Sequence, residues 1–217
     1  MKQHHRLWTR AAAGLALVMS LGACAPLVVG SMVGGAMVAS DRRTSGIQLE
    51  DEGIELRGGN RIREMLGSRV HINITSYNRQ VLLTGEVPTQ KDKDYANQLI
   101  SQVENVRTVV NELAVAPTSS LSDRSMDALI SGKVKASMVD SKDIFANAFK
   151  VVTERGTVYL MGRVTQREAQ RATDLARQVS GVKKVVRVFD ILTEEELQAL
   201  LPPPPKNAAP ATSSEAK

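Results

Sequence analysis

The sequence predicts an α+β protein made of two tandem αββαβ domains, each a three-stranded sheet with two helices on one face. The main observation is an internal repeat, because 81–87 (VLLTGEV) matches 158–164 (VYLMGRV) in spacing and residue type. Both segments alternate apolar residues with others, as strands do. Downstream, four apolar residues in 172–179 have the i, i+3, i+4, i+7 spacing of one helix face.

Each copy of the repeat predicts the same elements in the same order. A helix comes first, and two strands joined by a tight turn follow it, the second strand being the repeated segment. A second helix and a last strand complete the copy. The expected bounds, copy one before copy two, are a first helix over 51–67 and 123–140, a turn at 77–80 and 154–157, and a last strand over 106–115 and 182–192.

Gly85 and Gly162 lie inside the repeated strands, where glycine weakens pairing. We expect a structural role for both, either the close approach of a helix or a bulge, rather than contact with a ligand.

The N-terminus predicts an export signal. Three basic residues precede an apolar run at 11–19, and 21–24 (LGAC) looks like a lipobox, in which Cys24 would be the acylated mature N-terminus. The alternative is an ordinary signal peptide that contains a cysteine. The predicted layout is a leader 1–23, a lipidated tether 24–44, domain one 45–115, a linker 116–120, domain two 121–192 and a disordered Pro/Ala-rich tail 193–217.

Charge is distributed unevenly between the two copies. The chain has 28 basic and 23 acidic residues, and removal of the basic leader brings the balance close to neutral, which argues against a nucleic-acid partner. Domain one has 8 basic and 10 acidic residues, whereas domain two has 13 and 8. This basic excess suits an anionic membrane, although drift between duplicated domains would also produce it.

The residues of a catalytic site are missing from the sequence. No nucleophile–base pair, zinc-protease motif or phosphate loop is found, so we predict no enzyme activity, no metal, no cofactor and no small-molecule substrate. His71, the one histidine outside the leader, is interpreted as a strand surface residue. The acidic run 50–52 is interpreted as a solvated helix start.

The Val-x-Leu-x-Gly-x-Val strands and the run 179–185 (VSGVKKV) resemble the BON domain. Together with 41–48, 72–77 and 160–169, they resemble dual-BON outer-membrane lipoproteins. The resemblance implies a lipid-anchored protein of the outer membrane that faces the periplasm and binds anionic phospholipid through domain two. It also implies a role in envelope integrity and a concentration at division sites. The family can carry a tryptophan on the first helix of domain two, where this chain has Leu129.

The first helix of domain two carries two stripes. An inward stripe is predicted from residues four apart, namely Ile130, Val134 and Met138. About one residue's rotation away lie Met126, Leu129 and Lys133, with Lys135 on a flank. Apolar residues beside lysines are typical of a helix that lies at a membrane interface. Three alternatives stay open: packing against copy one, docking on an outer-membrane assembly or division protein, and a periplasmic chaperone-like role.

Overall fold

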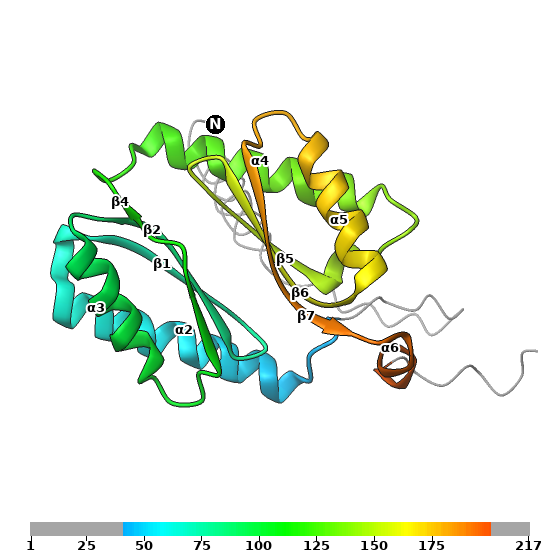
Figure 1. Ribbon diagram of the computed structural model, residues 1–217, viewed down its shortest axis with the longest axis horizontal. Coiled ribbons are helices and arrows are strands. Elements are labelled where there is room, and N and C mark those ends of the chain that lie inside the picture. The colour runs from blue at the N-terminus through cyan, green and yellow to red at the C-terminus, as the bar shows by residue number, and fades with distance from the viewer. Residues whose placement is uncertain (1–40, 201–217) are drawn as a thin grey trace, which may run out of the picture. The chain divides into compact units, whose positions relative to one another are not determined.

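The computed structural model describes residues 41–200, in which two αββαβ units follow one another (Figure 1). Copy one, 45–115, consists of α2 (Ser45–Leu66), the short η2 (Gly67–Arg69), β1 (His71–Tyr77), β2 (Gln80–Val87), α3 (Gln90–Ser101), β3 (Thr108–Asn111) and β4 (Ala114–Val115). Copy two, 121–192, consists of α4 (Leu121–Val139), the short η3 (Ala146–Ala148), β5 (Phe149–Glu154), β6 (Thr157–Thr165), α5 (Gln166–Gln178) and β7 (Lys184–Leu192). The predicted α+β class with two αββαβ units is confirmed.

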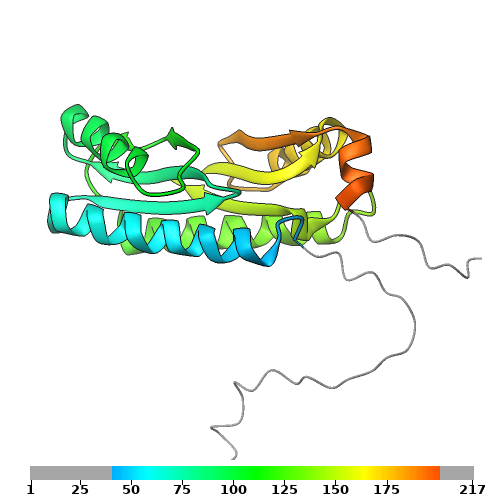
Figure 2. The ribbon, with the colours of Figure 1, turned by 90° about the horizontal axis from the view of Figure 1, so that it is seen from below.

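The repeated strand lies at the centre of each sheet. In copy one, β2 pairs antiparallel with β1 and parallel with β3 and β4. In copy two, β6 pairs antiparallel with β5 and parallel with β7. A parallel neighbour requires a crossover, which α3 and α5 provide. The two helices of each copy cover one face of its sheet, and Figure 2 shows α2 running lengthwise along its strands.

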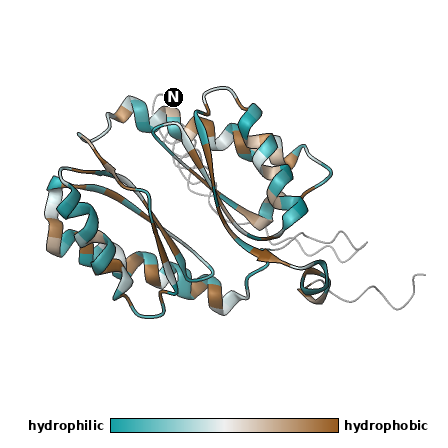
Figure 3. Ribbon diagram, in the orientation of Figure 1, coloured by the Kyte–Doolittle hydropathy of each residue, from teal (hydrophilic) through white to brown (hydrophobic). Residues whose placement is uncertain are grey.

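Each copy has its own core between its helices and its sheet. In copy one, Ile54 and Ile62 of α2 pack with Val81 and Leu83 of β2. In copy two, the buried cluster contains the predicted inward stripe of α4, together with alternate residues of β6 and the alanines of α5. In Figure 3, the central strands β2 and β6 carry apolar runs, while the helices alternate between apolar and polar residues.

A third buried cluster joins residues of both copies. Leu82 of β2 is fully buried against this cluster, although its neighbours Val81 and Leu83 face the core of copy one. In copy two, Tyr159 and Met161 of β6 are likewise buried in this cluster. Both faces of each central strand are therefore buried, one by helices and the other by this shared cluster, and the two sheets keep separate strands.

The two strand glycines lie against backbone. A Cβ at Gly85 would lie 2.1 Å from the carbonyl oxygen of His71, and a Cβ at Gly162 would lie 2.4 Å from that of Ala148. Gly85 also has a φ of 112°, which L-residues rarely adopt. The close approach is therefore made by the backbone at the start of β1 for Gly85 and at the end of η3 for Gly162, rather than by α2 or α4.

The ends of the folded region differ from the prediction. Helix α2 begins at Ser45, six residues earlier than expected, because Thr44 accepts a hydrogen bond from the Ile47 amide as an N-cap. A further helix, α6 (Glu194–Leu200), lies within the predicted tail, and its Leu197 is buried. Thr193 and Glu196 exchange capping hydrogen bonds at its start.

Cys24, the leader, most of the tether and the tail beyond residue 200 lie outside the described residues. Within residues 41–200, no helix has the length and apolar character needed to cross a bilayer.

Candidate functional site

Helix α4 begins at a capping box. The Ser120 hydroxyl accepts from the Asp123 amide, and the Asp123 carboxylate accepts from the Ser120 amide. From there the helix directs every third or fourth side chain into the core, and the buried residues are Asp127, Ile130, Val134 and Met138. The predicted inward stripe thus fixes the rotation of the helix and determines which residues face outward.

Asp127 is a buried acid that ties α4 to the hairpin between β5 and β6. Its two carboxylate oxygens accept from the amides of Arg155 and Gly156 at 2.7 and 2.8 Å. Both turn residues have positive φ, and the carboxylate binds the amides that this turn leaves unpaired. The role of this aspartate is therefore structural.

Asp51 binds the equivalent hairpin turn in copy one. The interpretation of 50–52 as a solvated helix start is therefore wrong for Asp51. It is 2% exposed and accepts from the amides of Asn78 and Arg79 and from the Ser76 hydroxyl. The sequence signal that could have revealed this role is an aspartate one turn before a buried apolar stripe in both copies. It was missed because neighbouring acids also suit a helix start.

The outer face of α4 exposes apolar side chains. Met126 and Leu129 are 56% and 52% exposed, as expected for a second stripe that does not pack on copy one. Leu121 and Val139, at the two ends of the helix, are more exposed still and were not predicted. Phe145, in the loop after α4, is half-exposed. Exposure at helix ends depends on how the helix sits on its sheet, which periodicity does not reveal.

The two lysines have different surroundings. Lys133 is exposed on the outer face of α4, as predicted. Lys135 instead points inward, and its ammonium donates to the carbonyl oxygens of Ala146 and Phe149 at 2.5 and 2.9 Å. Burial lowers the pKa of Lys135. Its cation serves the loop between α4 and β5, so we do not assign it a lipid headgroup.

Met126 borders a cleft of about 390 Å³ at the start of α4. Arg155 and Lys183 line the same cleft, so a partly exposed thioether lies close to two cations. Asp123 also lines it, but its carboxylate is used by the capping box. Hydrogen bonds from the Ser120 side chain and amide hold the pKa of Asp123 below its usual value.

Copy one offers a natural comparison. Its helix α2 also exposes two leucines, Leu49 and Leu56, at 69% and 64%. Exposed charges of both signs lie on that helix, namely the acids Glu52 and Glu64 and the bases Arg57 and Arg63. Apolar exposure is therefore common to both copies, and the charge difference lies in the totals of the two copies rather than in these two helices.

The segment before α2 connects the copies. Arg42 binds Glu168 of α5 through two hydrogen bonds of 2.7 Å and donates to the Arg163 carbonyl. Arg43 binds Asp51 and lies over the Tyr77 ring, 4.2 Å from its centroid. The last residues of the predicted tether are thus part of the folded unit.

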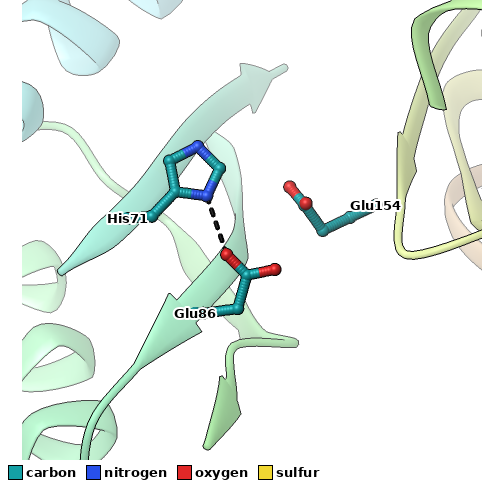
Figure 4. A group of neighbouring side chains, drawn as sticks. All are labelled: His71, Glu86 and Glu154. Carbon is teal, nitrogen blue, oxygen red and sulfur yellow. Dashed lines mark hydrogen bonds and ion pairs between the residues drawn. The ribbon is translucent and has the colours of Figure 1, made fainter. Parts of the chain in front are cut away.

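His71 lies in a polar cluster rather than on an open strand surface (Figure 4). Its Nδ1 is 2.9 Å from Oε2 of Glu86, directly across the β1–β2 pair, and Glu154 of copy two points toward both. The cluster was missed because the repeat alignment carries no information on which residues meet across the copies.

The BON domain family model matches residues 60–117 and 126–193, one segment in each copy. The chain belongs to the BON-domain family. The resemblance inferred from the strands is therefore confirmed. A fold family by itself does not fix a ligand.

Among curated relatives, outer membrane lipoprotein DolP of Haemophilus influenzae is 39% identical over 180 residues, 82% of this chain and 93% of the relative. A 21 kDa hemolysin of Actinobacillus pleuropneumoniae is 32% identical over 69% of this chain and 78% of its own length. Osmotically-inducible protein Y of Escherichia coli is 30% identical over 52% and 58%. The similarity to DolP extends beyond the two BON segments.

Proposed function

We propose that this chain is a non-enzymatic outer-membrane lipoprotein of the cell envelope that binds anionic phospholipid through the outer face of α4. The outer-membrane location and the anchor on Cys24 rest on the similarity to DolP of Haemophilus influenzae and on the lipobox pattern. A contribution to envelope integrity and a concentration at division sites belong to the same proposal. The observation that carries the lipid part is the exposed apolar stripe of α4 on the basic copy.

Two physical effects support binding at this face. Burying one leucine side chain in an apolar phase contributes about 1.5–3 kcal/mol, and Leu121, Leu129 and Val139 are all more than half exposed. Each basic residue near an anionic leaflet contributes about 1 kcal/mol, and Lys133 and Lys183 are exposed. Neither effect suffices alone, but together they favour an anionic membrane over a neutral one.

Co-sedimentation with vesicles tests the proposal on the whole mature chain, with Cys24→Ala so that no anchor contributes. We expect binding to vesicles containing phosphatidylglycerol and little binding to phosphatidylcholine alone. Leu129→Glu should weaken binding by about tenfold or more, because it removes apolar burial and adds a repelled charge. Lys133→Glu should weaken it less, and salt should reduce that difference.

Matched variants on copy one separate this mechanism from a general effect of charge. Leu56→Glu makes the same change on an exposed residue of α2, and Lys91→Glu makes the same charge reversal on α3. Both should bind vesicles nearly as the parent does. Equal losses from Leu56→Glu and Leu129→Glu, or binding that ignores lipid charge, would reject the mechanism. The exposed face of α4 would then be assigned to a protein partner.

A further inference from the structure

The cluster around His71 brings together three side chains that bind metals. His71 comes from β1, Glu86 from β2 and Glu154 from the end of β5, so two elements of copy one and one of copy two contribute (Figure 4). One donor atom from each lies within 4.8 Å of the others. A single ion with ligand distances of about 2.0–2.2 Å needs donor atoms some 3.3 Å apart, so the three side chains would close in by up to about 1.5 Å on binding.

The two buried carboxylates have a single arginine between them among the described residues. The side chains of Glu86 and His71 are 0% and 18% exposed, and Glu154 is 6% exposed. Glu86 has one cation, Arg155, at 3.3 Å. Among the described residues, the hydrogen bond to Glu154 comes from a neutral amide, Asn73, at 3.0 Å. Buried charges in proteins are normally paired or bound to a metal.

The repeat supplies an internal comparison. By the alignment of the two copies, the positions equivalent to Glu86, His71 and Glu154 are Arg163, Ala148 and Tyr77. These three also lie together, because the Tyr77 hydroxyl approaches the Ala148 carbonyl and Arg163 follows on β6. At that end, the chain brings its own cations, Arg42 and Arg43. At the acidic end, the equivalent segment before α4 has no arginine. Ser119 stands in place of Arg43, so its amide and hydroxyl donate to Glu86 but bring no cation.

We propose that His71 Nδ1, Glu86 and Glu154 bind one divalent transition-metal ion, with Zn²⁺ the best match, that joins copy one to copy two. Imidazole nitrogen with two carboxylates is a donor set suited to zinc, and two negative ligands balance its charge. Ser119 and Arg155 also bind Glu86 and would hold it in place as outer-shell partners. This site is independent of the lipid-binding proposal.

The site has a route to solvent. A cleft of about 490 Å³ is lined by His71, Asn73 and Glu154 together with residues of α4 and β5. An ion can enter through it, and water can complete a four-coordinate shell, as three protein ligands leave one position open. The ion would replace the direct hydrogen bond between His71 and Glu86 and would link β1 and β2 to β5.

The test measures zinc binding by the full mature chain in two ways. Equilibrium dialysis with metal analysis gives the number of ions bound, and thermal unfolding gives the stabilisation that they cause. We expect one Zn²⁺ per chain and a higher unfolding midpoint with zinc, because an ion at 100 times its Kd shifts the folding equilibrium about 100-fold. His71→Ala and Glu154→Gln should each weaken binding at least tenfold and remove the zinc-induced shift. Co²⁺ used alone should give the absorption of a four-coordinate site, and Mg²⁺ should give no shift.

Glu154→Gln keeps the test valid even if His71→Ala unfolds. The amide preserves the shape and an acceptor for Asn73 while removing a buried charge, so the metal-free variant should be at least as stable as the parent. Glu104→Gln makes the same change on an exposed acid and should leave zinc binding unchanged. Absence of stoichiometric binding, or binding that survives both His71→Ala and Glu154→Gln, would overturn the proposal and leave a hydrogen-bonded contact between the copies.

Discussion

The Arg42–Glu168 ion pair gives the sharpest test of how the segment before α2 is held. The side chains of Arg42 and Glu168 are 6% and 2% exposed, so removing one partner leaves a buried charge. Breaking such a pair costs about 3–5 kcal/mol. Glu168 keeps its capping-box bond from the Thr165 amide at 3.0 Å, which places Arg42→Met near the lower end. If the folded region 41–200 unfolds as one unit, at about 2–4 °C per kcal/mol, the unfolding midpoint should fall by about 6–12 °C.

Thermal unfolding followed by circular dichroism measures this change, and two further variants interpret it. Arg57→Met breaks a more exposed ion pair, in which the side chains of Arg57 and Glu50 are 43% and 30% exposed. It should lower the free energy of unfolding by no more than about 1 kcal/mol. Arg42→Met with Glu168→Gln should recover part of the loss, because no buried charge remains and glutamine can still serve the capping box. If Arg42→Met costs no more than Arg57→Met, the segment is not anchored as described.

The same pair predicts a dependence on acid. Burial alone would raise the pKa of Glu168, but the hydrogen bonds from Arg42 and from the Thr165 amide outweigh it and hold the pKa below the usual 4.5. A lowered folded-state pKa means that this stabilisation is fully present above pH 4.5 and is lost as the pH falls through the folded-state value. Unfolding midpoints between pH 7 and pH 3 should therefore fall less steeply in Arg42→Met than in the parent.

Three further predictions concern the Asp127 carboxylate, the strand glycine Gly162 and the N-terminal anchor. Asp127→Asn should lower the free energy of unfolding in chemical denaturation by about 1–3 kcal/mol, because an amide oxygen accepts only one of the two turn hydrogen bonds. The control is Asp174→Asn on an exposed acid. An equal loss from both variants would contradict the role of Asp127 in holding the turn. Gly162→Val should cost about 1–3 kcal/mol or more through overpacking, whereas Gly132→Ala, with open space around it, should stabilise α4 slightly. Intact mass of the membrane-extracted protein should show Cys24 as an acylated N-terminus, and an unmodified mass would refute the anchor.

The fold could be predicted because the internal repeat, the strand alternation and the helix-face spacing together specify it. Val81 and Leu83 alternate as a strand does, and Ile130, Val134 and Met138 recur as one helix face does. Both signals are local, and two copies in one chain confirm each other. The class, the element order and the rotation of α4 followed from them without reference to any residue far away in the sequence.

What could not be predicted depends on contacts between distant residues. Lys135 was placed on a membrane-facing flank by its angle on the helix, but its long side chain reaches two carbonyl oxygens of the following loop. Arg42 was assigned to a tether, yet its partner Glu168 is 126 residues away. His71 looked like a surface residue because the strand that faces it belongs to the other copy. Pattern arguments assign a face, and they do not identify what covers that face.

The duplication itself separates structural residues from candidate functional ones. Where both copies keep the same residue, the fold explains it: Asp51 and Asp127 each hold a hairpin turn, and Gly85 and Gly162 each meet a backbone carbonyl. The copies differ where the fold imposes no requirement. When Asp127 of α4 is aligned with Asp51 of α2, Leu129 falls on Gly53. This position lies on a face that contacts solvent in both copies.

His71 and Glu86 likewise stand where copy two has Ala148 and Arg163. One copy therefore shows that the fold forms without the residue in question, while the other keeps it at some cost. Exposed leucines do not stabilise a soluble surface, and buried carboxylates without full compensation are unfavourable. Residues that a duplicated fold tolerates but does not need are best explained by something they bind, and we propose an anionic lipid surface for α4 and a metal ion for the His71 cluster.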